Sequence, residues 1–521
     1  MVAVAVASLI TGCTSTSNTA ERASSGTVSP GSSATGSGSP ATFAEAPCPQ
    51  PNYPGDPSLD LGPTVVCGYL IVPEDRRDPT GPTIRLAVAR APAVSDGGGA
   101  HPLVYLQGGP GESALLLASR SLEAGINADR EVIYVEQRGN YHSEPNLVCP
   151  EVEAFLTASV SEHFSDPAVE AQSAAATTAC RDRLTADGID LTSYTTGQNA
   201  ADVADLRVAM GIDEWDVYGT SYGTDLALRV LRDHPEGIRS VVLDSAVPPN
   251  LNPMAEFWPG FAEGYQALFD GCAAQPACTA AFPDLAREFA DTVNRLAASP
   301  ITVAVPDGAG ATTEVNIDGY RFANLVGILV ASGPATAALA PVLIHQIANG
   351  DAVAGGAALA STAIPRPGVN ADGFTWSASC PDWTAGTNRE DVLAKAQAAL
   401  PELPEAVLRL QPQLARYFDD CAIWDVGESP ASARAPVLSD VPVLLLGGTF
   451  DGVTPISWQD ALRPGLTDAQ SVAFPGLGHT VVDQSPCAMS VMQAFLATPG
   501  APVDQACVAQ MAIPSFATTL G

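Results

Sequence analysis

Positive charge is scarce in this chain of 521 residues, which has 24 lysines and arginines against 57 aspartates and glutamates, a net charge of −33. So large an acidic excess repels nucleic acids and anionic lipid head groups, so neither is an expected ligand. Clustered cysteine and histidine spacings such as C-x-x-C are also absent, so we predict no metal site and no cofactor. Only six histidines are present, so each one can be considered in turn as a catalytic candidate.

The N-terminal apolar run, residues 2–10, is too short to span a bilayer. It leads into small residues before Cys13, as in a bacterial lipoprotein processing site. We expect residues 1–13 to be a lipoprotein-type signal peptide and Cys13 to carry the lipid, so that the protein is held at the cell surface and meets the membrane only through that anchor. The alternative is plain secretion. Residues 14–46, rich in Ser, Gly and Pro, are predicted to be a flexible tether.

The chain has eleven cysteines, and setting Cys13 aside leaves ten. An even number in an exported chain is typical of a disulfide framework, so we predict five disulfides. Spacing alone leaves the connectivity open, and the simplest hypothesis pairs nearest neighbours: Cys48 with Cys67, Cys149 with Cys180, Cys272 with Cys278, Cys380 with Cys421, and Cys487 with Cys507.

One short motif carries most of the functional signal. The sequence Gly-Thr-Ser-Tyr-Gly at residues 219–223 places Ser221 between two glycines, the pattern of a nucleophile elbow on a strained strand-to-helix turn. Residues 215–218 are predicted to end a buried strand, and residues 225–231 have the apolar spacing of a helix. The flanks therefore supply the strand, turn and helix that the motif requires.

Two later loops supply an acid and a base. Asp451 follows an apolar run of strand length at residues 441–448, and His479 follows a second short strand at residues 471–474. Because the carboxyl ends of parallel strands meet at one edge of a sheet, we expect both side chains to converge on Ser221. The chain order Ser, Asp, His is that of α/β-hydrolases.

Each of these residue types answers a need of acyl transfer. A serine hydroxyl is a poor nucleophile at neutral pH, so His479 would take its proton and return it to the leaving group, and Asp451 would orient and stabilise the imidazolium. The alternative for Asp451 is a simple turn with Gly452, and for His479 an ordinary place in a loop. The other five histidines lack this setting of a strand followed by a glycine turn.

An oxyanion hole is predicted beside the nucleophile. Residues 102–106 read as a strand, and the glycine-rich residues 107–113 that follow let the backbone approach a ligand closely. In this fold the two donors are the N–H after the nucleophile and one from the loop after an early strand, here Tyr222 and Gly109. The alternative is a Gly/Pro turn without a catalytic part.

The alternation of strands and helices predicts an α/β fold with a mostly parallel sheet flanked by helices. We expect residues 47–245 to form the first part of this core and residues 436–521 to complete it. Residues 246–435 leave the alternation, with helix-like stretches such as 284–296 and 391–400, and are predicted to be a large, mainly helical lid over the carboxyl edge of the sheet.

Five ordered motifs resemble the prolyl iminopeptidase and tripeptidyl aminopeptidase group of α/β-hydrolases. They are G-G-P-G at 108–111, E-Q-R-G at 136–139, the serine motif, D-G-V-T-P at 451–455 and G-H at 478–479. The tripeptidyl aminopeptidase-like branch fits best, since residues 441–487 match its C-terminal order of strand, D-x-x-T-P loop, G-H turn and cysteine. The Cys-containing segment 379–383 also looks like a lid motif of that branch. The resemblance implies a serine aminopeptidase acting on peptides.

Three features depart from that group. Gln107 stands where prolyl iminopeptidases usually have histidine, Glu136 stands where they have aspartate, and residues 140–143 differ from the usual loop of small residues. These departures leave the predicted triad intact and bear on the choice of substrate.

An aminopeptidase must recognise a cationic amine, which buried carboxylates do through charge-assisted hydrogen bonds. Glu256 and Glu263, beside aromatic residues at the start of the lid, are the candidates. The alternative is that both are solvated acids on a helix.

The combined interpretation is an exported serine hydrolase that releases tripeptides, dipeptides or single residues from free N-termini through an acyl-enzyme. A carboxylesterase on the same scaffold is the nearest rival, since the same triad cleaves esters. A non-catalytic surface lipoprotein that binds ligands is a rival of another class.

Overall fold

The computed structural model describes residues 41–51, 58–95, 100–306, 311–366 and 369–520. The predicted signal peptide, the lipidation site Cys13 and most of the predicted tether lie outside the described residues.

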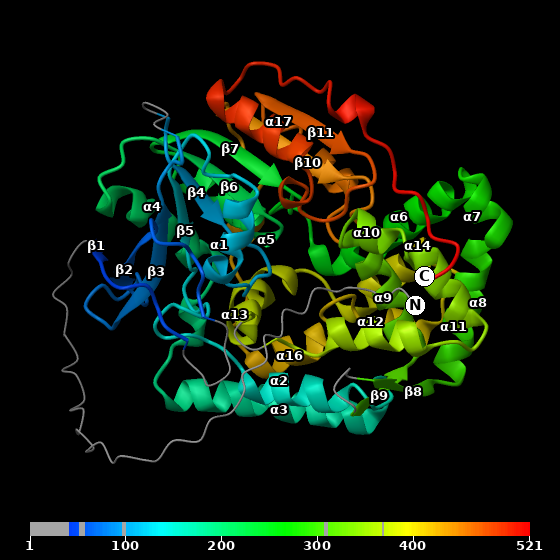
Figure 1. Cartoon of the computed structure of the whole chain (residues 1–521). Coiled ribbons are helices and arrows are strands. Elements are labelled where there is room, and N and C mark those ends of the chain that lie inside the picture. The colour runs from blue at the N-terminus through cyan, green and yellow to red at the C-terminus, as the bar shows by residue number, and fades with distance from the viewer. Residues whose placement is uncertain (1–40, 52–57, 96–99, 307–310, 367–368, 521) are drawn as a thin grey trace, which may run out of the picture.

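A nine-stranded sheet organises the molecule, in the order β1-β2-β3-β5-β4-β6-β7-β10-β11 (Figure 1). β1, β2, β3 and β5 pair antiparallel, and every other neighbouring pair is parallel. The strands are β1 (Thr42–Glu45), β2 (Val66–Pro73), β3 (Thr83–Ala91), β4 (Leu103–Leu106), β5 (Val132–Val135), β6 (Trp215–Thr220), β7 (Ile238–Asp244), β10 (Val443–Gly448) and β11 (Ala469–Phe474). The strands predicted near residues 102, 215, 441 and 471 are confirmed.

Helices cover both faces of this sheet, because its central strands are buried on both sides. Alternate residues of one strand serve opposite faces: Tyr105 packs with α1 (Ala114–Glu123) and α17 (Pro486–Ala497), whereas Val104 packs with α4 (Thr196–Ala209) and α5 (Tyr222–Asp233). The predicted α/β-hydrolase architecture, with a mostly parallel sheet between helices, is confirmed.

The strand register brings the predicted site loops to one edge. Leu106 pairs with Gly219, Thr220 with Asp244, and Asp244 with Leu446. The loops that follow β4, β6, β7, β10 and β11 therefore leave the sheet side by side, as the sequence predicted from the carboxyl ends of parallel strands.

The predicted tether extends too far. Its last residues form β1, which pairs antiparallel with β2, and the Cys48–Cys67 disulfide fixes the segment that follows. The Ser/Gly/Pro-rich composition of the region hid this short strand. Phe43 packs toward the core, whereas its neighbours in the strand are exposed. Residues 42–46 thus belong to the core.

The lid between β7 and β10 has a core of its own. It contains α6 (Pro253–Ala273), α7 (Pro276–Ala281), α8 (Leu285–Ala298), β8 (Ile301–Pro306), β9 (Thr312–Ile317), α9 (Gly319–Ala331), α10 (Pro334–Ala337), α11 (Ala340–Ala348), α12 (Val353–Ala363), α13 (Asp372–Trp383), α14 (Arg389–Ala399), α15 (Glu405–Leu408) and α16 (Tyr417–Trp424). The mainly helical lid is confirmed, with one added hairpin, β8–β9.

Two helices from the first part of the chain join the lid. α2 (Pro150–Ser159) and α3 (Pro167–Ala186) run beneath α13 and α16 in Figure 1. The Arg321 guanidinium, on α9, donates to the carbonyl oxygens of Ser159, Val160 and Glu162. The predicted boundary at residue 245 therefore misplaces residues 150–186, which lie on the lid side because their apolar faces pack there.

Five disulfides form, joining Cys48 to Cys67, Cys149 to Cys180, Cys272 to Cys278, Cys380 to Cys421 and Cys487 to Cys507. These are the predicted nearest-neighbour pairs. Each links segments at most 41 residues apart, so every bridge reinforces one local unit of the fold.

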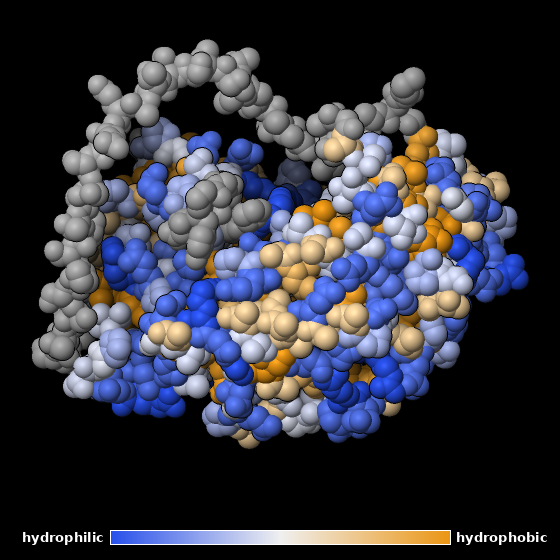
Figure 2. All heavy atoms as spheres, turned by 90° about the horizontal axis from the view of Figure 1, so that it is seen from below, coloured by the Kyte–Doolittle hydropathy of each residue, from blue (hydrophilic) through white to orange (hydrophobic). Residues whose placement is uncertain are grey.

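Hydrophilic and hydrophobic residues are interspersed over the face that Figure 2 shows, below α2 and α3. In the part of the chain that the structure describes, no helix combines the length and apolar character needed to cross a membrane.

Candidate active site

Ser221 sits on the turn between β6 and α5 with φ of 53° and ψ of −127°, a conformation that costs energy for a residue with a side chain. The flanking glycines allow this turn. A Cβ at position 219 would clash with the Gly223 carbonyl group, and one at position 223 would clash with the Leu106 carbonyl group. The predicted strand-turn-helix setting is confirmed, and strain at the serine is the signature of a nucleophile elbow.

Asp451 and His479 meet at the same edge. Asp451 Oδ2 lies 2.9 Å from His479 Nδ1, with the aspartate side chain fully buried and the histidine side chain 21% exposed. The backbone N–H groups of Val453 and Thr454 both donate to Asp451 Oδ1 at 2.9 Å. The carboxylate is therefore fixed by its own loop, and the imidazole presents its Nε2 side away from it.

Thr454 is a member of this site that the sequence analysis quoted only as part of a motif. Its hydroxyl donates to Asp451 Oδ2 at 2.9 Å and lies 3.1 Å from His479 Nδ1. The hydroxyl thus braces both partners of the pair. The spacing D-x-x-T was the available signal, because a threonine three residues after an aspartate is placed to bond back to it.

The electrostatics of the pair favour its charged form. Burial alone would lower the pKa of His479, but the Asp451 charge and their hydrogen bond outweigh it and raise the pKa above 6.5. Burial likewise opposes the charge on Asp451, but His479 and the hydrogen bonds from Thr454 hold the pKa of that carboxyl below 3.8. An imidazolium formed during a reaction would be stabilised here.

Ser221 is tied to the histidine loop through one short segment. Ser221 N–H donates to the Asp244 carbonyl oxygen, the Val481 and Val482 N–H groups donate to the Asp244 carboxylate, and Thr480 N–H donates to Ser245 Oγ. In the described part of the chain no hydrogen bond joins the Ser221 hydroxyl to His479. The structure thus brings the loops of Ser221 and His479 together, and the complete triad stays a prediction.

The glycine-rich loop lies directly against Ser221. A Cβ at position 108 would stand 2.7 Å from Ser221 Cβ, and Gly109 adopts φ of 108°, which favours glycine. Tyr222, which follows Ser221, begins α5. The use of the Tyr222 and Gly109 N–H groups as oxyanion donors stays a prediction.

The departures from the family pattern are structural supports of this loop. The Gln107 side-chain amide donates to Glu112 Oε2 at 2.7 Å. Buried Glu136 accepts from the Ser113 hydroxyl at 2.6 Å and from Ala114 N–H at 2.7 Å, and His142 Nδ1 lies 3.1 Å from it. The carboxylate thus binds the N-terminus of α1, where negative charge is favoured.

The start of α13 closes over the same loop. Ala371 N–H donates to the Gly111 carbonyl oxygen at 2.8 Å, and the Thr375 hydroxyl donates to the Pro110 carbonyl oxygen at 2.5 Å. A side chain at position 111 would strike Thr375 and Asn370. Hydrogen bonds to backbone carbonyl groups therefore join the lid directly to the glycine-rich loop.

A cavity of about 340 Å³ opens between α9 and α13. Its α9 wall includes Tyr320 and Ile328, and Ala331 at the end of α9 accepts the His479 N–H at 2.6 Å. Its α13 wall includes Thr375, which bonds the oxyanion loop. Both walls are thus tied by hydrogen bonds to loops of the predicted site, but the residues that line the cavity do not include Ser221 or His479.

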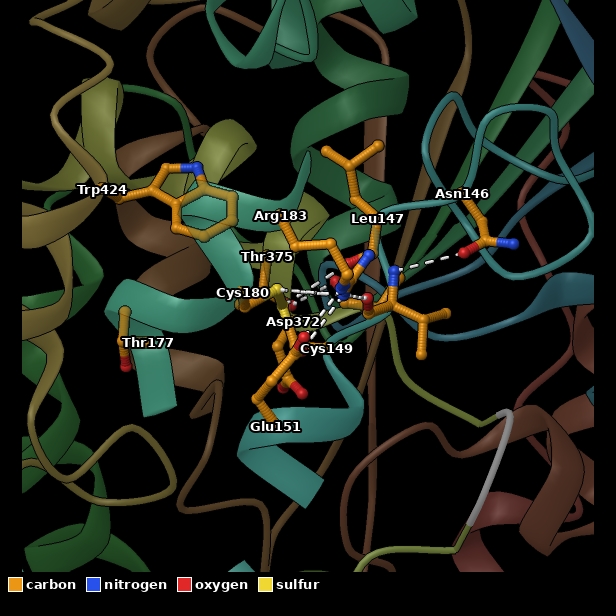
Figure 3. The surroundings of a disulfide bond; sticks show 12 residues. Asn146, Leu147, Cys149, Glu151, Thr177, Cys180, Arg183, Asp372, Thr375 and Trp424 are labelled. Atoms are coloured by element: carbon orange, nitrogen blue, oxygen red, sulfur yellow. Dashed lines mark hydrogen bonds and ion pairs between the residues drawn. A yellow bond between two sulfur atoms is a disulfide. The ribbon is translucent and has the colours of Figure 1, made fainter. Parts of the chain in front are cut away.

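Two acids also line this cavity. Asp372 begins α13, and Asp420, on α16, accepts from the Thr177 hydroxyl of α3 at 2.8 Å. In Figure 3 Asp372 and Thr375 lie beside the buried Cys149–Cys180 disulfide, which joins the start of α2 to α3.

The two predicted amine-binding acids lie on α6, outside the lining of that cavity. Glu256 forms an ion pair with Lys395 on α14. Glu263 accepts from the Ser457 hydroxyl at 2.7 Å, and burial raises its pKa. Their part in binding an amine stays a prediction.

The lid segment 379–383 contacts α5, the helix after Ser221, through a buried hydrogen-bond network. Asp382 Oδ2 accepts from Arg229 Nη2 at 2.9 Å and from the Thr196 hydroxyl at 3.2 Å. Thr196 in turn accepts from the Tyr222 hydroxyl at 2.9 Å, and Arg229 also pairs with Asp225. The sequence marked this segment as a motif but gave no sign of its partner on α5.

Comparisons with known proteins find similar peptidases and a similar fold. Residues 407–507 match the TAP-like protein family. Serine protease Hip1 of Mycobacterium tuberculosis is 26% identical over 472 residues, covering 84% of this chain and 85% of its own length. Tripeptidyl aminopeptidase of Streptomyces lividans is 30% identical over 223 residues, covering 40% of this chain and 39% of its own. The crystal structure of proline iminopeptidase from Mycobacterium smegmatis superposes with a TM-score of 0.39 at 16% identity, covering 82% of this chain and 97% of that one.

Proposed function

Because the chain is an α/β-hydrolase with a TAP-like C-terminal region, we propose that it is a serine peptidase that removes short peptides from free N-termini. The observation that carries the proposal is the buried Asp451–His479 pair, held at the sheet edge beside a serine in a strained turn. The relationship to a serine protease and to a tripeptidyl aminopeptidase supports peptides as the substrate class.

The reaction would proceed through an acyl-enzyme. Ser221 Oγ bonds to the scissile carbonyl carbon while its proton passes to His479 Nε2, since Nδ1 faces Asp451. The N–H groups of Tyr222 and Gly109 would hold the oxyanion. His479 then gives the proton to the leaving amine as the C–N bond breaks. Water, deprotonated by His479, releases the acyl group and restores the Ser221 hydroxyl.

Export is part of the proposal. All ten cysteines in the described residues are paired, a state that persists in oxidising compartments. A lipid anchor at Cys13 would hold the enzyme at the cell surface. Labelled palmitate incorporated into the wild-type chain but not into Cys13→Ala tests this part, and equal labelling of both would remove it.

One comparison of substrates tests the activity. We expect kcat/KM on a tripeptide anilide with a free N-terminus to exceed that on its acetylated form by at least about 100-fold. A higher kcat/KM on a short acyl ester than on any peptide would favour the carboxylesterase instead. A fluorophosphonate probe should label the wild-type protein and not Ser221→Ala; equal labelling would exclude Ser221 as the nucleophile.

A further inference from the structure

Strained backbone is concentrated at one point of the sheet edge. In the described part of the chain, the residues other than glycine with a left-handed φ are Ser221, Ser245, Gln413, Asp425 and Thr480. Three of them, Ser221, Ser245 and Thr480, lie within one hydrogen-bonded group. Such conformations cost energy for residues with side chains, and they gather where a fold holds a functional site in shape. The strain therefore points to the segment that lies between Ser221 and Thr480.

The end of β7 forms that segment. Ser221 N–H donates to the Asp244 carbonyl oxygen at 2.9 Å. Thr480 N–H donates to Ser245 Oγ at 2.8 Å. Because Asp244 and Ser245 are neighbours in the chain, one dipeptide bonds the Ser221 turn on one side and the residue after His479 on the other.

The Asp244 carboxylate binds the histidine loop at two further points. Its Oδ1 accepts from Val481 N–H at 2.8 Å, and its Oδ2 accepts from Val482 N–H at 3.0 Å. Together with the bond to Ser245, the N–H groups of the three consecutive residues that follow His479 are held by one dipeptide. The backbone that carries the imidazole is therefore fixed by two side chains at the end of β7.

The Asp244 carboxylate is a buried charge. Its side chain is fully buried, and within the described residues it forms no ion pair with a lysine or an arginine. The Tyr218 hydroxyl donates to its Oδ2 at 3.0 Å, and Asp483 is the other acid whose charge acts on it. Burial raises the pKa of Asp244 to about 6, against the opposing hydrogen bonds from the two backbone N–H groups and Tyr218. The carboxylate is therefore ionised at neutral pH and above.

This charge acts on His479. Burial lowers the pKa of His479, whereas Asp451 raises it most, followed by Asp244 and then Glu112. Asp451 bonds the ring at Nδ1, whereas Asp244 acts through space, with no hydrogen bond to the ring in the described structure. Asp244 is therefore the second acid, after Asp451, that favours an imidazolium at this position.

We propose that Asp244 and Ser245 are positioning residues of the reaction. Their side chains hold the backbone after His479 so that its imidazole meets Ser221, and the Asp244 charge favours the imidazolium. An apolar side chain at position 244 would leave the N–H groups of Val481 and Val482 without acceptors in the interior. This inference rests on the proposed function and deepens it, by adding two residues that act through the histidine without touching the substrate.

The experiment compares Asp244→Asn and Ser245→Ala with the wild-type enzyme on a short acyl ester and a tripeptide anilide. Asp244→Asn removes the charge and leaves one of the two backbone N–H groups without an acceptor, so kcat at pH 9 should fall about 30-fold. Ser245→Ala removes a single acceptor, so kcat should fall about fivefold. KM should stay within about twofold of wild type in both variants, because neither side chain touches the substrate.

The pH dependence separates the charge from the shape. Asp244→Asn removes a charge that raises the pKa of His479, so the acid limb of kcat/KM should move down by about half a pH unit. Ser245→Ala removes no charge and should leave the limb in place while kcat falls. NMR titration of the six histidines, with His479→Gln to identify one signal, measures the same pKa without turnover.

Ser240→Ala is the matched control. Ser240 is a buried serine on the same strand, and its hydroxyl donates to Asp216 at 2.6 Å, at the opposite end of β6 from Ser221. This variant should lower the thermal midpoint by an amount similar to Ser245→Ala, and should keep the kcat and the acid limb of wild type.

Equal losses of kcat in Ser240→Ala and Ser245→Ala would mean that the hydrogen bond serves the fold, and would overturn the proposal. A kcat within about twofold of wild type in both edge variants would also overturn it, as would an Asp244→Asn variant in which the acid limb and the imidazole pKa do not move. If Asp244→Asn does not fold, Ser245→Ala measured against Ser240→Ala decides the positioning role. Failure of the proposed function looks different, because the wild-type enzyme would hydrolyse the ester and no peptide, and the variants would still be compared on the ester.

Discussion

The sheet edge that holds Asp451 and His479 differs from the lid cavity in the form of its acids that it stabilises. At the edge Asp451 is satisfied by two backbone N–H groups, a hydroxyl and His479. In the cavity burial is the main cause that raises the pKa values of Asp372 and Asp420 to about 7, and Arg416 and Arg389 oppose it at Asp420. The edge therefore stabilises a charged pair, whereas the cavity favours the protonated form of its acids.

The largest effect should come from removing the charge at the edge. Asp451→Asn keeps the shape of the side chain but no longer accepts from His479 with a full charge, so kcat should fall about 10⁴-fold on peptides and esters alike. The pKa of His479, now raised by Asp451, should fall toward or below 6.5. Steady-state kinetics and NMR titration of the imidazole measure both. A loss confined to peptides would break the division between edge and cavity.

A smaller loss should follow a change at Thr454. Thr454→Val deletes the hydroxyl that bonds Asp451 and neighbours His479, and should lower kcat about 30-fold with KM nearly unchanged. Thr454→Ser keeps the hydroxyl and should restore most of the rate. If the serine variant is as slow as the valine variant, the methyl group and not the hydrogen bond is what matters.

The pH dependence of the rate should report on His479. His479 must be neutral to act as a base, and its pKa lies above 6.5, so peptides and esters should both lose rate as pH falls through that value. The acid limb of kcat/KM should therefore be the same for both substrates, and a limb seen with peptides alone would contradict the assignment of His479 as the base.

The sequence predicted the edge well because its residues lie in local patterns. The strand before Ser221, the glycine turn before His479 and the D-x-x-T spacing each describe a few consecutive residues, and the sheet brings their ends together by a general rule. The cavity has no such pattern. Asp372, Asp420 and Thr177 come from three helices, which are brought together by the Cys380–Cys421 disulfide between α13 and α16 and by the packing of α16 on α3. The strand at residues 42–45 was missed for a related reason, since its partner β2 lies more than twenty residues away.

The smallest effect should come from the buried network that links Asp382 of the lid to Arg229 on α5. Asp382→Asn removes the lid charge that faces Arg229, but Asp225 still pairs with that guanidinium, so no cation is left unpaired in the interior. The hydrogen bond that leads through Thr196 to the Tyr222 hydroxyl weakens, which loosens the start of α5 and its backbone donor. We expect kcat/KM to fall about threefold to tenfold on peptide and ester equally, with a lower thermal midpoint. A change confined to KM for free-amine peptides would instead mean that this network serves peptide binding by the lid, because a lid that only binds the peptide has no reason to alter ester hydrolysis.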